Sequence, residues 1–124
     1  MSIKAVVIPV SLKEKPYITT IDDYRSYYPI IGCRAFDVVT LYDDDHCSVD
    51  CYIDDEGQIN ESPVNQYFLR AYQAGLVNYP LFGIGVVNIT DLESGESSEL
   101  NIDLVKDTLK NYGFIESELE DLEY

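Results

Sequence analysis

The sequence predicts an α+β fold: a single small domain with a mixed, mostly antiparallel sheet and two or three helices packed on it. Three observations lead to this class. Short β-prone stretches recur along the chain, two later segments carry apolar residues at helical spacing, and 124 residues with 46% hydrophobic content suit one domain with a buried core. We assign residues 1–113 to this domain. Residues 114–124 hold five acids and no base, which predicts an acidic C-terminal tail or a frayed helix.

The N-terminal elements follow from apolar runs and their breaks. The unbroken apolar stretch Ile3–Val10 predicts a central strand covered on both faces, and a second short strand is expected at 17–21. A helix after it is limited to about two turns, because Pro29 disfavours helical geometry at the preceding residue. Gly32 then marks a break in the chain.

A β-hairpin is expected next, with strands at 35–42 and 47–53 joined by a loop at 43–46. The second strand alternates apolar and polar residues, which is typical of an antiparallel strand with one buried face. Its outward residues would be Ser48, Asp50 and Tyr52. A turn at 54–57 follows.

The second half contains the two strongest helical patterns. Ser62 is the expected N-cap and Pro63 the first residue of a helix over 63–74, with Gly75 as its stop. A strand at 81–89 and an acidic loop at 91–99 come next. Apolar spacing from Ile102 to Tyr112 predicts the last helix, with Asn101 as a candidate cap and Gly113 as its stop.

Charge restricts the function more than any motif does. The chain has 23 acids against eight bases, a net charge of −15, which argues against direct binding to nucleic acid or to an anionic membrane. No apolar run has the length of a membrane span or of a signal peptide, so we expect a soluble, cytoplasmic protein. The excess is uneven, since residues 35–69 contain nine acids and no Lys or Arg.

Metal and nucleophile chemistry fit the sequence poorly. The three cysteines, Cys33, Cys47 and Cys51, form an odd set without a secretory signal, which favours free thiols. Cys47 and Cys51 would lie about 13 Å apart along a strand, too far to share a zinc ion. His46 is the single histidine and would point to the opposite face from Cys47. We therefore expect no catalytic residues, no metal and no cofactor.

Several short motifs occur together in an order seen elsewhere. They are Ile31-Gly32-Cys33, then Asp54-Asp55-Glu56-Gly57-Gln58, then Pro63-Val64-Asn65. Over about residues 1–90 the chain resembles a family of small phage- and plasmid-borne domains of unknown function, in which a Val-Gly-Gly step precedes a strand and a DEEGK…PxN stretch follows the hairpin. Here Cys33 replaces the second Gly and Gln58 the common Lys. The resemblance implies a mobile-element accessory protein in a bacterial host cell and supplies no activity.

These observations lead us to expect a non-enzymatic interaction protein that binds a basic host protein through an acidic surface. By analogy with anti-restriction and anti-CRISPR inhibitors, it could mimic DNA toward a nucleic-acid-binding defence protein. The β-rich edge and eleven tyrosines also allow a homodimer. The expected partner-binding residues are Asp43, Asp44, Asp45, Asp50, Asp54, Asp55 and Glu56, with Tyr42 and Tyr52 as aromatic anchors.

An alternative function is binding or sequestering a small ligand. Its pocket would lie between the helix at 63–74 and the sheet. Asn65, the backbone of Gly83 and Gly85, and a tyrosine hydroxyl would contact the ligand. Acid–base catalysis by paired carboxylates is a third, weaker option.

Overall fold

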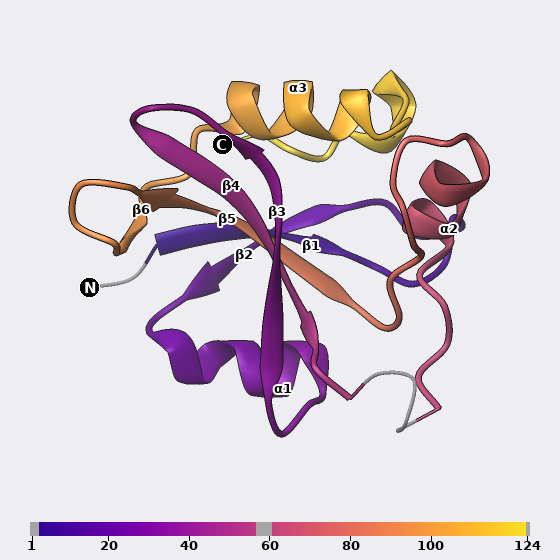
Figure 1. Cartoon of the computed structure of the whole chain (residues 1–124), viewed down its shortest axis with the longest axis horizontal. Helices are drawn as coiled ribbons and strands as arrows, with labels where there is room; N and C mark the ends of the chain where they lie inside the picture. Colours follow the sequence, from indigo (N-terminus) through magenta and orange to yellow (C-terminus); the bar gives the residue numbers. More distant parts are fainter. Residues whose placement is uncertain (1–2, 57–60, 124) are drawn as a thin grey trace.

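The computed structural model describes residues 3–56 and 61–123 and shows an antiparallel six-stranded sheet with helices on both faces (Figure 1). The strand order is β2-β1-β5-β4-β3, and β6 pairs with β5. This confirms the predicted α+β class. The strands are β1 (Ile3–Ile8), β2 (Tyr17–Ile21), β3 (Phe36–Asp43), β4 (Cys47–Asp54), β5 (Gly85–Asp91) and β6 (Ser97–Ser98). The helices are α1 (Tyr27–Ile31), α2 (Gln66–Gln73) and α3 (Ile102–Asn111), with single 3-10 turns η1 (Tyr24–Ser26) and η2 (Glu116–Glu118).

The sheet separates two apolar clusters. The larger cluster lies between the sheet and α2, α3 and the C-terminal segment, where Phe68, Val105 and Leu109 are buried. The smaller cluster lies under α1, where Tyr27 and Ile31 cover Ala5 and Val86. In Figure 1, α3 and α1 accordingly lie on opposite sides of the sheet.

The expected central strand at the N-terminus is confirmed as β1. It pairs with β2 on one side and β5 on the other, and Ala5–Ile8 are at most 1% exposed. A strand covered on both faces needs apolar side chains at every position, which is what this run supplies.

The expectation that β4 has one solvent-facing side is wrong. Ser48 and Asp50 are 6% and 5% exposed, although both point away from the larger cluster. β4 pairs with β3 on one side and β5 on the other, so it is an interior strand of the sheet. Alternation along the sequence distinguished the two faces correctly, but polar residues on the second face turned out to be buried as well.

The first helix extends further than expected. α1 includes Pro29 and ends at Ile31, followed by Gly32 with φ of 78°. Pro29 is the third residue of α1, and the first four N–H groups of a helix have no partner within it. Its missing N–H therefore costs no helical hydrogen bond at this position.

The helix expected to begin at Ser62 and Pro63 begins later. Asn65 is the N-cap of α2, and its side-chain Oδ1 accepts hydrogen bonds from the N–H groups of Tyr67 (3.1 Å) and Phe68 (3.4 Å). Val64 instead forms an isolated antiparallel bridge with Phe82. The preceding residues are thus extended, and the capping amide fixes the start of the helix.

The last helix follows the sequence closely. Asn101 caps α3 through a hydrogen bond from the Leu104 N–H (3.1 Å), and Gly113, with φ of 89°, follows its end. The strand predicted at 81–89 is shifted, because Gly83 has φ of 82° and regular pairing starts only at Gly85. The predicted loop at 91–99 contains the short strand β6.

The segment after Gly113, expected as an acidic tail or frayed helix, packs onto the larger cluster. Phe114, Leu119 and Leu122 are at most 3% exposed, and η2 lies between Phe114 and Leu119 in the sequence. Apolar residues among the acids of this segment supply the buried contacts.

Candidate functional site

Two hairpin turns, far apart in the sequence, meet at one end of the sheet. The β3–β4 turn spans Asp44–His46, and the β5–β6 turn spans 92–96. Cys47 is paired with Asp91 across the two strands, and the Leu92 N–H donates a 3.0 Å hydrogen bond to the His46 carbonyl. In Figure 1 both turns lie at the left end of the molecule.

This juxtaposition brings six carboxylates to one end of the sheet. We call them the tip surface: Asp43, Asp44, Asp45, Asp91, Glu93 and Glu96. Five are exposed and Asp91 is half-buried. A hollow of about 280 Å³ lies between the turns, lined by His46, Cys47, Asp91, Glu93 and Ser98.

Two of the six carboxylates build the turns. Asp44 Oδ1 accepts hydrogen bonds from the N–H groups of His46 (2.7 Å) and Cys47 (2.9 Å), and its Oδ2 accepts one from the Tyr42 hydroxyl (3.0 Å). These donors lower the pKa of Asp44, and the bond to the carboxylate raises the pKa of Tyr42. Asp91 Oδ1 accepts the Glu93 N–H at 2.9 Å. Both side chains therefore hold their turns in place, and the lowered pKa keeps Asp44 ionised at neutral pH.

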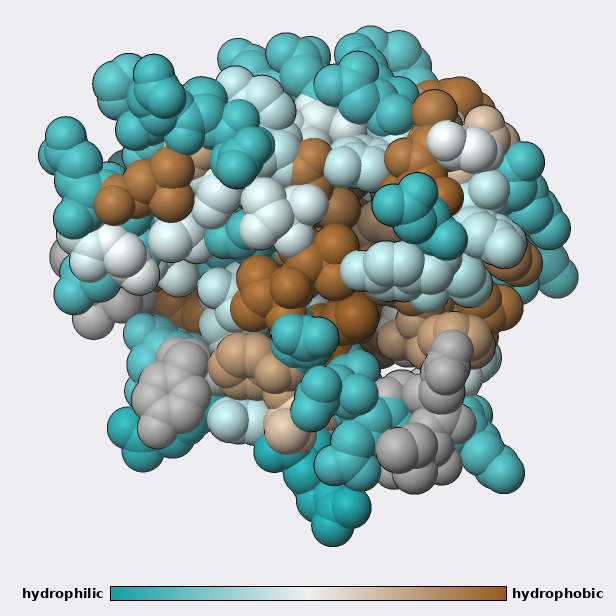
Figure 2. All heavy atoms as spheres, in the orientation of Figure 1, coloured by the Kyte–Doolittle hydropathy of each residue, from teal (hydrophilic) through white to brown (hydrophobic). Residues whose placement is uncertain are grey.

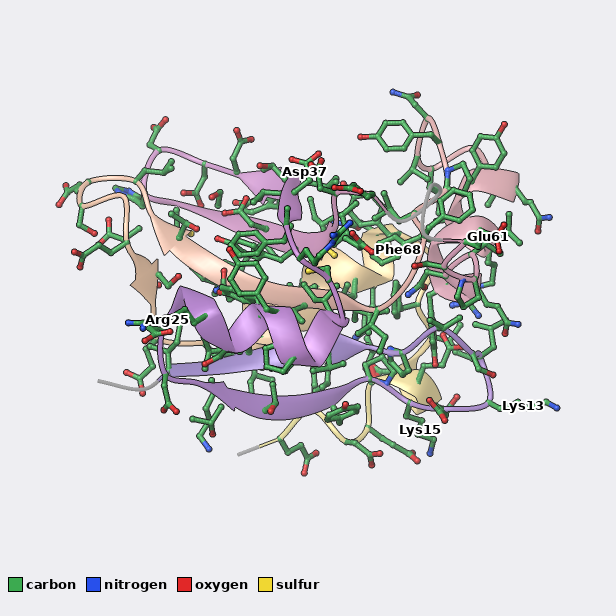
Figure 3. All side chains as sticks on the ribbon, turned by 90° about the horizontal axis from the view of Figure 1, so that it is seen from below. Lys13, Lys15, Arg25, Asp37, Glu61 and Phe68 are labelled. Carbon is green, nitrogen blue, oxygen red and sulfur yellow. The ribbon has the colours of Figure 1, made fainter. Side chains whose placement is uncertain are left out.

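The other four carboxylates are available to a partner. Within the described part of the chain, no hydrogen bond or ion pair engages the side chains of Asp43, Asp45, Glu93 or Glu96. Arg25 lies toward the same end of the molecule and pairs with Asp23 at 3.6 Å, whereas Lys13 and Lys15 lie at the opposite end (Figure 3).

The second acidic run of the prediction does not join the first. Asp54–Glu56 follow the far end of β4, seven residues from Cys47, which places them about 23 Å away at ~3.3 Å per residue. That separation exceeds the Debye length of about 8 Å at physiological salt. Asp54 is 7% exposed, and its Oδ1 accepts the Glu56 N–H at 2.9 Å. The seven acids predicted to bind the partner therefore do not share one surface, and Asp54 is buried at the end of β4.

Asp50 is the largest correction among the predicted site residues. Instead of facing solvent, its carboxylate accepts hydrogen bonds from three hydroxyls: Thr40 (2.9 Å), Ser48 (2.9 Å) and Thr90 (2.6 Å). Thr40 belongs to β3 and Thr90 to β5, so the network ties three adjacent strands together. A buried carboxylate needs such donors, since its desolvation is otherwise costly.

The two predicted aromatic anchors differ in exposure. Tyr42 is 37% exposed beside the tip surface, as expected. Tyr52 is half-buried and stacks on Tyr27, with ring centroids 4.3 Å apart and planes at 8°. Phe36 contacts both rings edge-on. Tyr52 is thus part of the packing under α1.

The residues of the predicted ligand pocket have structural roles. Asn65 is 0% exposed, and its Nδ2 donates to the carbonyls of Ile8, Pro9 and Gly83 at 3.0–3.3 Å. A Cβ on Gly85 would lie 2.8 Å from Cys51 Sγ. The space beside Gly85 is therefore filled by Cys51 of the neighbouring strand β4, while Phe68 of α2 lies at ordinary contact distance, 3.7 Å. The amide of Asn65 joins β1, α2 and the segment before β5.

The cysteines are free: Cys33 and Cys47 are half-buried and Cys51 is buried. Burial raises the pKa of the Cys51 thiol to about 12, so it is protonated at neutral pH. Within the described residues, no three His, Cys, Asp or Glu side chains converge in a way that could hold a metal ion.

Sequence reasoning missed the acids of the β5–β6 turn as part of the site. Asp91, Glu93 and Glu96 belong to the acidic loop that composition identified, but their position depends on β4 pairing with β5. Strand order between segments 40 residues apart leaves no local signal in a single sequence. Gly57 and Gln58, which belong to the motif resemblance, lie outside the described residues.

The fold and this surface define a small acidic α+β domain with carboxylates gathered at one end of its sheet. The chain belongs to the family described as "Domain of unknown function (DUF3846)", whose model matches residues 3–113. The match runs from β1 to the end of α3, which confirms the expected relation to domains of unknown function. No curated protein and no solved structure matches the chain. No helix among the described residues is long and apolar enough to cross a membrane.

Proposed function

We propose that this protein is a non-enzymatic interaction protein that binds a basic partner protein through the tip surface. The observation that supports this best is the convergence of two acidic turns, from residues 43–45 and 91–96, at one end of the sheet. Four of the carboxylates have no partner within the described chain, so their charge is directed to solvent. The negative electrostatic field of these carboxylates speeds the encounter with positively charged surfaces and disfavours binding to negatively charged ones.

The basic partner of this proposal is a nucleic-acid-binding protein of a bacterial host. Grooves that bind nucleic acid are lined by Lys and Arg. Closely spaced carboxylates at the tip surface could occupy such a groove in place of phosphates. The motif resemblance favours a phage or plasmid accessory protein acting in the bacterial cytoplasm. The sharpest form of the proposal is therefore a DNA-mimic-like inhibitor of a defence protein, of the anti-restriction or anti-CRISPR type.

The design of the tip surface allows a clean test. The four unpaired carboxylates can be neutralised isosterically in the variant D43N/D45N/E93Q/E96Q, which keeps the turn-building Asp44 and Asp91. A matched control, E61Q/D107N/D121N/E123Q, removes four charges from exposed positions elsewhere. Both variants have the same net charge, so a difference between them reports the location of the charge and not its amount.

The experiment compares the proteins retained from bacterial lysate by immobilised wild type, tip variant and control at low salt. The proposal predicts that basic nucleic-acid-binding proteins bind wild type and control and are lost from the tip variant. Duplex DNA should displace them, and 0.5 M salt should do the same, because the Debye length falls to about 4 Å. Equal recovery by the tip variant, or binding that neither DNA nor salt reduces, would refute the proposal.

A further inference from the structure

β3 is the last strand of the sheet, and its outer edge is not paired with any other described strand. The Asp55 N–H donates to the Ala35 carbonyl at 3.1 Å, which sets the pairing with β4. Because antiparallel pairing alternates, the main-chain groups of Phe36, Val38 and Thr40 point away from β4. This edge is a template for a further strand.

Among the described residues, two side-chain hydrogen bonds protect the edge. The Val38 N–H donates to Asp37 Oδ1 at 2.8 Å, and the Tyr112 hydroxyl donates to the Leu41 carbonyl at 2.6 Å. A register shift between Thr40 and Tyr42 also interrupts the ladder. Such features reduce indiscriminate pairing of an edge, and here they leave the outward groups around Thr40 open.

A hollow lies beside this edge, on the face of the sheet that carries α2 and α3. Its volume is about 210 Å³, equal to about seven waters at ~30 Å³ each, which is room for an aliphatic or aromatic side chain. Most of its lining residues are apolar, although polar atoms also form a large part of its exposed wall. The lining residues that matter here are Val39 and Leu41 of β3, Phe68 of α2, Leu81, and Leu76 and Tyr79 of the loop after α2.

The rim of the hollow exposes apolar side chains, since Leu76 and Tyr79 are 45% and 57% exposed. Val38 of β3 is 42% exposed on the other face of the same strand. Figure 2 shows hydrophobic residues gathered at the centre of the visible face, where β3 runs in Figure 1. Polar residues surround this area, a pattern typical of an interaction site.

Acids flank the edge at both ends. Asp37 lies at one end of β3, where its side chain is seen at the molecular surface in Figure 3, and Asp43–Asp45 lie at the other. The entire β3–β4 region lacks Lys and Arg. An occupant of this groove therefore encounters negative charge at each end and apolar surface between them.

This charge pattern decides between two kinds of occupant. A second copy paired antiparallel about Thr40 would place Asp37 opposite Asp43 of the other chain, and like charges directly opposite are destabilising. Each copy also carries a net charge of −15. Self-association through β3 is thus disfavoured, and a basic segment of another protein is favoured.

We infer that the outer edge of β3 binds an extended segment of a partner protein as an additional strand. An apolar side chain of that segment fills the hollow beneath β3. Lys or Arg residues on either side of it, about six positions apart like Asp37 and Asp43, face the flanking acids. The inference depends on the proposed function for the basic character of the partner. The unpaired edge and the hollow are separate from the tip surface, whereas Asp43–Asp45 belong to both.

The test is a selection of random twelve-residue displayed peptides on the immobilised full chain. The enriched peptides should carry alternating apolar residues between two Lys or Arg residues, and their binding should shift the NMR amide signals of β3. Methylating alternate peptide nitrogens should weaken binding at least about tenfold, because each methyl group removes one backbone hydrogen bond to β3. No enrichment, unchanged affinity after methylation, or signal changes confined to other strands would each overturn the inference.

Matched variants separate this groove from the tip surface. L76D/Y79D makes the hollow more polar while adding negative charge, and L12D/Y17D makes the same change at other exposed sites. The selected peptides should lose at least about tenfold affinity for the first variant and keep it for the second. The tip variant lacks the Asp43 charge at one end of the groove, so it should bind the selected peptides more weakly than wild type but still with sensitivity to methylation. If the tip variant binds the peptides and also retains the same lysate proteins as wild type, the edge site stands and the proposed function fails. A dimer disrupted by L76D/Y79D would instead identify a second copy as the occupant and overturn the inference.

Discussion

The close packing of Cys51 of β4 against Gly85 of β5 gives a quantitative prediction. In a Gly85→Ala variant the new methyl carbon would lie 2.8 Å from Cys51 Sγ, while Ile8 Cβ and Phe68 Cε2 would each be 3.7 Å away. Only the sulfur contact is too short, so the strain is concentrated in one pair. Overpacking of this kind costs about 1–3 kcal/mol, partly offset by the lower entropy of the unfolded alanine chain.

We expect Gly85→Ala to destabilise the protein by about 2 kcal/mol. For 124 residues, at about 2.1 cal/mol/K of unfolding entropy per residue, this corresponds to about 8 °C in Tm. Urea unfolding followed by circular dichroism measures the free energy directly. Cys51→Ala should cost about 1 kcal/mol through the loss of a buried sulfur.

A double-mutant cycle tests whether the contact with Cys51 causes the destabilisation by Gly85→Ala. If the two groups compete for the same space, Gly85→Ala with Cys51→Ala should be at least about 1 kcal/mol more stable than the sum of the single changes predicts. Cys33 is half-buried and is absent from the contacts of Gly85, so Cys33→Ala should show additive behaviour. Additivity with Cys51→Ala, or a fully stable Gly85→Ala protein, would refute close packing and reopen this region as a ligand site.

Three further predictions concern single side chains. Asn65→Ala should destabilise by about 3 kcal/mol in urea unfolding, because it removes a helix cap and leaves three buried carbonyls without their donor; a loss below about 1 kcal/mol would contradict this role. Glu118 forms two hydrogen bonds with the Arg70 guanidinium (2.7 and 2.9 Å), which lowers the pKa of Glu118. Its stabilisation is therefore complete above the ordinary value of 4.5 and is lost as pH falls through the lower folded-state pKa, and Glu118→Gln should flatten the unfolding free energy against pH there. Cys51, with its raised pKa and complete burial, should resist a thiol reagent in the native protein and react only on unfolding, whereas the other two cysteines react first; labelling of all three at one rate would contradict the buried position.

Local patterns predicted most of the elements because their signals lie within a few residues. The apolar run of β1 and the cap and stop of α3 were read correctly from Ile3–Val10, Asn101 and Gly113. The start of α2 was misplaced because Ser62-Pro63 and Asn65 are both plausible starts. Only the long-range bonds of Asn65 to β1 and to the segment before β5 decide between them.

The candidate site was predicted in part for a related reason. Composition identified both acidic turns, and the hairpin placed Asp43–Asp45 at an exposed tip. Neither signal could show that β5 pairs with β4. This pairing brings Glu93 and Glu96 to the end of the sheet that carries Asp43–Asp45, whereas Asp54–Glu56 lie at the opposite end of β4. Nor could alternation reveal that Asp50 lies between two neighbouring strands that supply hydroxyl donors. These features depend on strand order, which a single sequence does not encode locally.

The most direct test of the tip surface compares proteins bound by the tip variant and by its matched control, at equal net charge and low salt. The tip-surface account predicts that basic nucleic-acid-binding proteins are retained by wild type and control, are released by duplex DNA and are lost from D43N/D45N/E93Q/E96Q. Retention of the same proteins by all three chains would show that net charge alone governs binding and would contradict a localised surface.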